Sequence, residues 1–196
     1  SEDVGGYKGS TWPSPFMRGI EDDKHDLLMK DVYLDTALMA KIIMGLDCVD
    51  EKRVATQGGS QGGALSIVCA SLVPEIKKCA PWCPYLSDFK HVYDIDLNKD
   101  AYDGLHYYFR LLDPTHSRED EIFNKLGYID IQNIAKRMKA ELLLQVGLVD
   151  TICPPSTQFA MYNKVTSKKN VILYPEYAHE IPPTGFDTII EFFADL

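Results

Sequence analysis

The chain has 196 residues and a mass of 22.1 kDa, which is the size of one domain with a sizeable core. Its 45% hydrophobic and 25% charged residues are typical of an ordinary soluble globular protein. The formal net charge of −9 argues against nucleic acid or an anionic membrane as a partner, since either requires a basic face, and no apolar run approaches the length of a membrane span.

The first part of the chain combines a loop with an amphipathic helix. Residues 1–24 are rich in glycine and proline, which predicts a loop. From about Asp26 to Met44 apolar residues recur at helical spacing, and Gly45 ends the pattern. Such a stripe normally faces the core. It consists of Leu27, Leu34, Leu38 and Ile42, widened by Met39 and Ile43.

A serine follows at the apex of a glycine-crowded turn. Arg53 to Gln57 predicts a short strand, and Gln61 to about Leu72 predicts a buried helix. The residues Gly58-Gly59-Ser60-Gln61-Gly62 between them fit G-x-S-x-G, the nucleophile elbow of α/β-hydrolases. The helix begins directly behind Ser60, so its free N–H groups point towards charge that develops on a substrate.

The glycines of this turn have a physical purpose. A sharp turn strains the backbone of Ser60, and we expect Gly58 and Gly62 to remove collisions with neighbouring side chains. The pentapeptide alone also fits an ordinary strand–helix turn. Two phosphate-binding motifs do not fit, because Gly62-Gly63 leads into Ala64 rather than into a lysine, and Ser60 occupies the third glycine position of a Rossmann fingerprint.

The middle of the chain changes in composition. Pro74 ends the helix behind the serine, and residues 76–80 predict the next strand. In residues 85–138 aromatic stretches alternate with charged ones, and the pattern is mostly helical. We interpret them as an insertion between core strands, which either caps an active site or builds an oligomer contact.

The last third of the chain alternates strands with helices. The near-continuous apolar run 141–146 predicts a strand buried on both faces of a parallel sheet. A helix over 156–165, a strand over 170–174 and an amphipathic helix with apolar residues from Phe186 to Phe193 follow. Thr184 and Asp187 offer a capping box for the final helix. The alternation predicts a single α/β domain, 1–196, with a mostly parallel sheet and flanking helices.

The cysteines are odd in number and scattered along the chain, at Cys48, Cys69, Cys79, Cys83 and Cys153. Cys79 and Cys83 are separated by Ala-Pro-Trp, which suits neither a zinc knuckle nor a redox C-x-x-C motif. No signal peptide opens the chain. We therefore expect five reduced thiols in a cytoplasmic protein.

A nucleophilic serine needs a histidine base, and the histidine needs an acid that holds it. In an α/β-hydrolase both residues follow the serine in the chain, the acid before the histidine. Each lies on a loop at the carboxyl end of a strand. Asp150 fits the acid because it follows the buried strand 141–146 by a short loop. Alternatively, Asp150 caps the next helix, although Ser156 offers a better cap nearer to that helix.

His179 fits the base. It follows the last predicted strand and precedes the final helix, whereas the other histidines precede Asp150 and break the required order. Those residues are His25, His91, His106 and His116. The alternative for His179 is an ordinary surface or core histidine. Glu180 beside it fits a neighbouring or surface charge better than a member of the triad.

Several stretches together resemble the acetyl xylan esterase / cephalosporin C deacetylase family, carbohydrate esterase family 7, which has the α/β-hydrolase fold. They are Gly58 to Gly63, Gly147 to Asp150 with Pro154 to Thr157, His179-Glu180, and Tyr85-Leu86-Ser87. The intervals from Ser60 to Asp150 and from Asp150 to His179 also resemble those of the family. The similarity runs over nearly the whole chain.

This resemblance implies a serine esterase that removes acetyl groups from acetylated xylo-oligosaccharides or similar small acetyl esters, cephalosporin C included, through an acetyl-enzyme intermediate. Ser60 would be the nucleophile, His179 the base and Asp150 the acid, while the N–H of Gln61 would give half of the oxyanion hole. No metal or organic cofactor is implied. Family members form cytoplasmic hexamers, so we expect a homo-oligomer that acts on a small acetylated carbohydrate.

The chain departs from the family at its front. The family carries an R-G-Q motif upstream of the elbow, preceded by strands, whereas this chain opens at Ser1-Glu2-Asp3, which resembles the residues after that motif. The resemblance therefore implies the C-terminal part of a longer enzyme, with its N-terminal strands missing and strands five to eight of the sheet left. It would lack the tyrosine N–H of the oxyanion hole and leave the elbow strand as a bare, apolar edge.

Two other interpretations stay open. The first is an inactive or weakly active fragment, because the loss of one oxyanion donor costs about 10²–10³ in turnover. The second is a peptidase or thioesterase of the same fold, because a fold does not determine a substrate.

Overall fold

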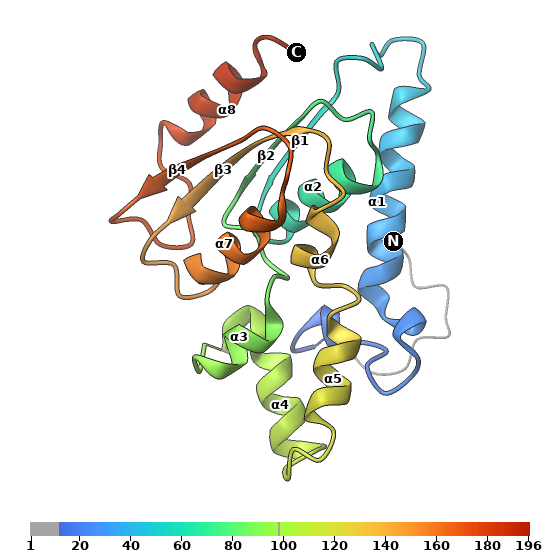
Figure 1. The fold of residues 1–196 in the computed structure, drawn as a ribbon, viewed down its shortest axis with the longest axis vertical. Coiled ribbons are helices and arrows are strands. Elements are labelled where there is room, and N and C mark those ends of the chain that lie inside the picture. The colour runs from blue at the N-terminus through green and yellow to red at the C-terminus, as the bar shows by residue number, and fades with distance from the viewer. Residues whose placement is uncertain (1–11, 98) are drawn as a thin grey trace.

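The computed structural model describes residues 12–97 and 99–196. Its strands form one parallel sheet in the order β1-β2-β3-β4 (Figure 1). Their bounds are Ala55–Gly59 for β1, Lys78–Trp82 for β2, Glu141–Gly147 for β3 and Lys169–Tyr174 for β4. The predicted α/β fold with a parallel sheet and flanking helices is therefore confirmed.

The helices are α1 (Leu28–Met44), α2 (Gln61–Leu72), α3 (Phe89–Asp94), α4 (Asp103–Leu111), α5 (Glu119–Leu126), α6 (Ile131–Ala135), α7 (Pro155–Lys164) and α8 (Gly185–Phe193), with the 3-10 turns η1 (Pro15–Met17), η2 (Lys24–Asp26) and η3 (Asp100–Tyr102). The four helices with predicted bounds, α1, α2, α7 and α8, lie close to them.

One face of the sheet carries the main core. Leu142, Leu144 and Val146 of β3 are fully buried and share a hydrophobic cluster with Ile67 and Val68 of α2. Helix α2 also packs against α1 and α6, and α6 packs against α7. Almost all of β3 is buried, which confirms the strand predicted to be covered on both faces.

The other face of the sheet is covered by α8. Neighbouring residues of a strand point to opposite faces, so Lys78 and Gln145 point away from the main core. The Gln145 side-chain amide donates to the carbonyl of Gly185 at 3.2 Å, and the Lys78 ammonium donates to the carbonyl of Phe192 at 2.6 Å. Figure 1 shows α8 apart from α2, α6 and α7, as this arrangement requires.

The apolar stripe of α1 does not face the core, and its expected orientation is wrong. The buried residues of this helix are Leu28, Met29, Tyr33 and Ala40. Leu27 alone of the stripe is buried, and it lies just before α1. The rest of the stripe, Leu34, Leu38, Met39, Ile42 and Ile43, is 41–57% exposed. The helical pattern correctly gives the spacing of these residues, but the spacing does not say which face meets α2.

The segment before α1 is more ordered than a loop prediction suggests. Phe16 of η1 is fully buried, with its ring centroid 4.9 Å from that of Phe89. The Ser14 hydroxyl donates to the carbonyl of Ala101 at 2.8 Å and accepts from the N–H of Gly104 at 2.9 Å. These bonds tie the segment to η3 and α4. The first part of the predicted loop, residues 1–11, lies outside the described residues.

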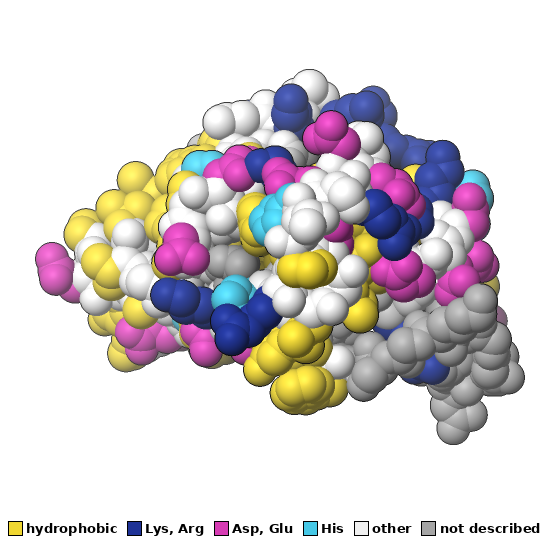
Figure 2. Space-filling model, turned by 90° about the horizontal axis from the view of Figure 1, so that it is seen from below, with side chains coloured by type: hydrophobic (Ala, Val, Ile, Leu, Met, Phe, Trp, Pro, Cys, Tyr) yellow, Lys and Arg dark blue, Asp and Glu magenta, His cyan; other side chains and the backbone are white. Residues whose placement is uncertain are grey.

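Helices fill the segment 85–138 that the sequence analysis interprets as an insertion. Figure 1 shows α3, α4 and α5 beyond the end of the sheet, while α6 packs against α2 and α7. Figure 2 shows the molecule from this end, where basic and acidic side chains are interspersed with hydrophobic ones. Whether this segment caps a site or forms an oligomer contact stays a prediction.

Two predicted helix caps are wrong. Thr184 at the start of α8 makes no side-chain capping bond, and the Thr188 hydroxyl donates to its carbonyl at 3.0 Å instead. Helix α7 begins at Pro155 after an N-cap at Pro154, and Ser156 lies within the helix. Proline is favoured at the first helical position because its φ suits the helix and its missing N–H needs no partner.

The five cysteines are unpaired thiols, with Cys48 exposed and the other four buried. Among the described helices none is both long and apolar enough to cross a membrane. The compartment stays a prediction.

Candidate active site

Ser60 occupies a strained turn between β1 and α2. Its backbone has φ 53° and ψ −119°, a conformation that non-glycine residues rarely adopt and that concentrates at functional sites. The N–H of Ser60 donates to the carbonyl of Trp82 at 3.1 Å, and its carbonyl accepts from the N–H groups of Ala64 and Tyr85 at 3.0 and 3.1 Å. These bonds hold the turn against the end of β2.

The glycines around Ser60 do not share one function. A Cβ on Gly58 would lie 2.5 Å from the carbonyl oxygen of Gly62, so the turn requires glycine there, as predicted. A Cβ on Gly62 would meet nothing within 4 Å, so the predicted collision at this position is wrong. Gly59 and Gly63 are crowded instead, because a Cβ would lie 2.0 Å from the Trp82 side chain at Gly59 and 3.0 Å from the Trp82 carbonyl at Gly63. It is the backbone of Gly62, and not its side-chain position, that approaches Gly58.

Asp150 and His179 form a direct pair. An oxygen of the Asp150 carboxylate, Oδ2, lies 2.9 Å from Nδ1 of His179. The other oxygen accepts from the N–H groups of Ile152 and Cys153, both at 2.9 Å. The Asp150 side chain is fully buried, whereas that of His179 is 19% exposed. The carboxylate is thus fixed on one side and directed at the imidazole on the other, and it does not cap α7.

The loop that carries His179 rests on the end of β3. A Cβ on Gly147 would lie 2.3 Å from the carbonyl of Ala178 and 2.5 Å from that of Tyr177, so the close approach requires glycine. The N–H of Val149 donates to the carbonyl of Tyr177 at 3.1 Å. The loop after β3 and the loop after β4 are therefore bonded to each other, which brings Asp150 and His179 together.

The sequence analysis missed Gln158 of α7. This residue is fully buried, and its side-chain amide lies 3.4 Å from Oδ2 of Asp150 and 2.6 Å from the carbonyl of Cys153. Gln158 therefore adds a donor to the oxygen that faces His179. Its place in the first turns of the predicted helix was visible in the sequence, but its inward direction was not.

Two buried thiols also line the site. Burial raises the pKa of the Cys83 thiol to about 12, and the negative charge of the nearby Asp150 carboxylate is the second cause. The same causes raise the pKa of the Cys153 thiol well above its usual range, and the neighbouring Ser60 hydroxyl acts in the opposite direction. Both thiols are therefore uncharged at neutral pH.

The predicted residues lie at one edge of the sheet but do not all touch. The carboxyl ends of parallel strands meet at a common edge, where Ser60 follows β1, Asp150 follows β3 and His179 follows β4. Among the described residues the Ser60 hydroxyl makes no hydrogen bond with the His179 ring, which is bonded to Asp150. Gln61 is exposed and begins α2, so its N–H has no acceptor within that helix.

The remaining histidines lie elsewhere. Nε2 of His91 lies 2.9 Å from the Ser156 hydroxyl, and Nδ1 of His116 lies 2.9 Å from a carboxylate oxygen of Glu119. Glu180, next to His179, is exposed. The acid that lies against a histidine at this edge of the sheet is Asp150.

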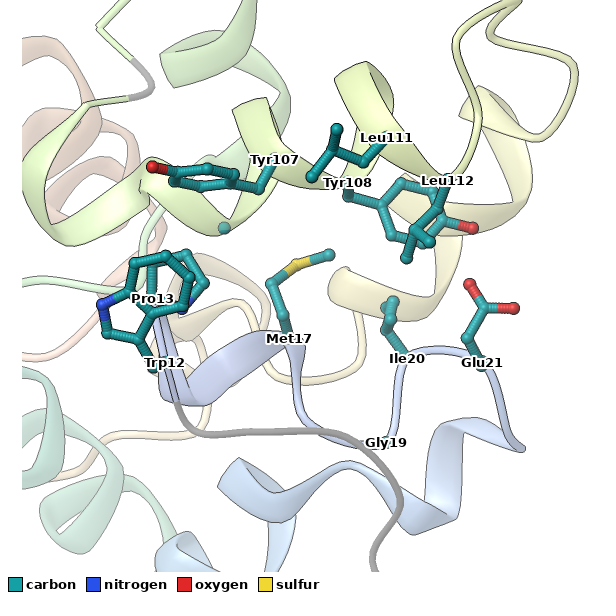
Figure 3. Close-up of a pocket in the computed structure, with 11 residues that line it drawn as sticks. Trp12, Pro13, Met17, Gly19, Ile20, Glu21, Tyr107, Tyr108, Leu111 and Leu112 are labelled. Carbon is teal, nitrogen blue, oxygen red and sulfur yellow. The ribbon is translucent and has the colours of Figure 1, made fainter.

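An apolar cavity of about 290 Å³ lies away from this edge, between the segment before α1 and helix α4 (Figure 3). Figure 3 shows Met17 in its middle, Trp12 and Tyr107 at one end and Glu21 at the other. The rings of Trp12 and Tyr107 pack with their centroids 5.3 Å apart. Ser60, Gln61, Asp150 and His179 do not line this cavity.

The chain is similar to known esterases. The sequence model of one protein family, described as acetyl xylan esterase (AXE1), matches residues 1–196. Acetyl esterase Axe7A of Xylanibacter ruminicola is 32% identical over 158 residues, which are 81% of this chain and 34% of that protein.

Two solved structures share the fold over 98% of this chain. The crystal structure of acetyl xylan esterase 1 from Thermoanaerobacterium sp. JW/SL YS485 matches with 48% identity and a TM-score of 0.95. The acetyl xylan esterase from Paenibacillus sp. R4 matches with 34% identity and a TM-score of 0.92. The chain spans 61% and 60% of these two proteins. The predicted α/β-hydrolase fold is confirmed by these matches.

Proposed function

The chain belongs to the acetyl xylan esterase family, and from this membership we propose that it is a serine esterase that removes acetyl groups from acetylated xylo-oligosaccharides. The chain spans about three fifths of the length of its solved relatives. The esterase activity of this chain is therefore a proposal. The observation that carries it is the buried Asp150 carboxylate, bonded to His179 at the sheet edge where the strained Ser60 lies.

The proposed reaction begins with the serine hydroxyl. His179 takes the proton of Ser60 as the Ser60 oxygen attacks the acetyl carbonyl carbon. The N–H of Gln61 donates to the oxyanion that forms. Asp150 holds the proton of the imidazole on Nδ1, which leaves Nε2 free to accept the serine proton, and it stabilises the imidazolium. His179 then protonates the leaving sugar oxygen, which departs as a hydroxyl, and water releases acetate from the acetyl-enzyme.

The finer parts of the proposal concern substrate and assembly. Small acetyl esters such as cephalosporin C fit the same chemistry, since the acetyl group is the part that reacts. Sugar hydroxyls are the leaving groups that the names of the relatives suggest. A cytoplasmic homo-oligomer is part of the same proposal.

Replacement of the nucleophile tests the activity. We expect the Ser60→Ala variant to lose p-nitrophenyl acetate hydrolysis by about 10⁶-fold, because the covalent step needs this hydroxyl. The matched control is Ser156→Ala, which removes an exposed hydroxyl from α7 and leaves the rate unchanged. An organophosphate ester should transfer its phosphoryl group to the Ser60 oxygen of the native chain, with loss of its leaving group, and should leave the variant unmodified.

The substrate is tested with a panel. Acetate release from acetylated xylo-oligosaccharides and from cephalosporin C is compared with cleavage of prolyl peptides and acyl-CoA thioesters. Faster turnover of the peptides or thioesters would replace the esterase by a peptidase or thioesterase of the same fold. A chain that neither hydrolyses any of these nor reacts with the organophosphate would be a non-catalytic relative.

A further inference from the structure

Three side chains that bind metal ions well converge beside the candidate site. Cys83 follows β2, Asp150 follows β3 and His179 follows β4, and one ligand atom from each lies within 4.8 Å of the other two. Within residues 12–97 and 99–196, no other group of three such side chains is so close together. Only Asp150 and His179 have a part in the proposed reaction, and Cys83 has none there.

The chemistry of these ligands selects the metal. Zinc binds thiolate sulfur at about 2.3 Å, imidazole nitrogen at about 2.0–2.1 Å and carboxylate oxygen at about 2.0–2.2 Å, with tetrahedral geometry. Two ligands of one zinc ion therefore lie roughly 3–4 Å apart. The separations in this cluster need only small side-chain movements to reach that range. Thiolate excludes the hard cations magnesium and calcium, which take oxygen ligands.

The structure also leaves these ligands available. The Cys83 sulfur lies 3.8 and 3.7 Å from the carbonyl oxygens of Ala178 and Glu180, and a thiol is a weak donor. Oδ1 of Asp150 stays bonded to two backbone N–H groups, while Oδ2 faces the imidazole. The His179 side chain is 19% exposed, so an ion can reach the cluster from that side.

We propose that Cys83, Asp150 and His179 form a binding site for a single zinc ion, which inhibits the chain when it is bound. The ion replaces the proton of the Cys83 thiol and the proton between Nδ1 of His179 and Asp150, and both protons pass to the solvent. With Nδ1 bound to the ion, the imidazole carries its proton on Nε2, so His179 no longer accepts a proton from Ser60. A water molecule or the substrate completes the tetrahedron. The inhibition rests on the proposed function, whereas the binding does not.

Calorimetric titration of the chelator-treated chain with zinc chloride tests the binding. We expect one zinc ion per chain, and at least about tenfold weaker binding in Cys83→Ala. Mutation of a residue that only supports a metal ligand already lowers metal affinity by about that factor. The matched control is Cys48→Ala, which removes an exposed thiol and should bind zinc as the native chain does. Equal binding by Cys83→Ala and the native chain would overturn the proposal.

Cobalt(II) provides a second measurement that needs no variant to fold. Cobalt bound by Cys83 should give a thiolate-to-cobalt charge-transfer absorption in the near ultraviolet, which zinc then displaces. Cobalt binding without this absorption would overturn the site even if Cys83→Ala failed to fold.

Zinc inhibition is measured last, with each variant compared with its own rate in chelator. We expect zinc to inhibit p-nitrophenyl acetate hydrolysis by the native chain and by Cys48→Ala, and to inhibit Cys83→Ala at least about tenfold less. Zinc binding in a chain that hydrolyses no ester would refute the proposed function while leaving the metal site in place. Zinc binding that leaves a measurable ester hydrolysis unchanged would overturn the inhibitory part of the proposal.

Discussion

At the scale of single residues, the Asp150 carboxylate determines how His179 is presented. It accepts hydrogen bonds from two backbone N–H groups through one oxygen, and it meets the His179 ring and the Gln158 amide through the other. Because the backbone donors hold one oxygen in place, the other can meet the imidazole in only one orientation. The candidate site thus depends on the turn that follows β3 as much as on the aspartate itself.

The Asp150→Asn variant separates charge from shape. The side-chain oxygen of asparagine can keep the bonds to the N–H groups of Ile152 and Cys153, which turns its NH₂ group towards His179. The imidazole must then accept at Nδ1, which places its proton on Nε2, where the serine proton should go. We expect kcat to fall by about 10⁴-fold with the fold unchanged.

The rate of p-nitrophenyl acetate hydrolysis and the circular dichroism of the native and variant chains check this expectation. A variant with native rate would show that His179 does not depend on the charge of Asp150.

At the scale of elements, the junction of β1 and α2 and the face of α1 show opposite outcomes. The junction behaves as its glycine pattern indicates, because Gly58 lies against the backbone of Gly62. Helix α1 forms where its pattern predicts, yet it buries Tyr33 and Ala40 rather than the residues of its apolar stripe. A turn depends on its own backbone, whereas the buried face of a helix depends on what packs against it.

Two alanine substitutions in the elbow make a matched pair. Gly58→Ala should destabilise the chain by several kcal/mol, because its Cβ meets backbone atoms of Gly62 at 2.5 and 2.6 Å that cannot move aside cheaply. Gly62→Ala should be neutral or stabilise by up to about 1 kcal/mol, since the new methyl group meets open space in the first turn of α2 and alanine favours helices.

Urea denaturation gives both free energies of unfolding. Equal destabilisation by the two substitutions would contradict this description of the turn.

At the scale of the whole molecule, the sheet lies between α8 on one face and the series α1, α2, α6 and α7 on the other. The helices from α3 to α5 extend beyond it (Figure 1). Buried polar groups connect these parts. Gln145 of β3 donates to α8 and accepts from the Tyr174 hydroxyl of β4, and Asp130 begins α6 by accepting from the N–H of Gln132. Of these groups Asp130 titrates in the acidic range, so the stability of the fold is sensitive to its protonation.

The stability should depend on pH through Asp130. Burial raises the pKa of its carboxyl to about 6, whereas an unfolded aspartate has a pKa of about 3.9. Between these values the folded state binds more protons than the unfolded state, so the free energy of unfolding falls as the pH rises, by about 3 kcal/mol in all.

The Asp130→Asn variant keeps an oxygen acceptor for the N–H of Gln132 but does not titrate. We expect the native chain to lose stability relative to the variant as the pH rises from about 4 to 6. Above about pH 6 the difference between their free energies of unfolding should stay constant. Urea denaturation over this range measures it. A difference that did not change with pH would show that Asp130 titrates normally in the folded chain.

The sequence by itself determined the elements and their order. Apolar periodicity placed β3 and α2 close to their observed bounds, because burial on both faces leaves a continuous apolar run and a helix leaves a regular spacing. The order of Asp150 and His179 after successive strands predicted that they would meet, because parallel strands all end at one edge of the sheet. The roles of these residues in catalysis stay predictions.

Only the tertiary structure decided which groups lie against one another. Asp150 and His179 are far from Cys83 in the sequence, yet the fold brings the three side chains together. Gln158 turns inward to the same carboxylate, and the apolar stripe of α1 stays exposed. The physical reason is common to these cases. A local pattern records the spacing of residues along one element, whereas burial and coordination depend on elements that arrive from distant parts of the chain.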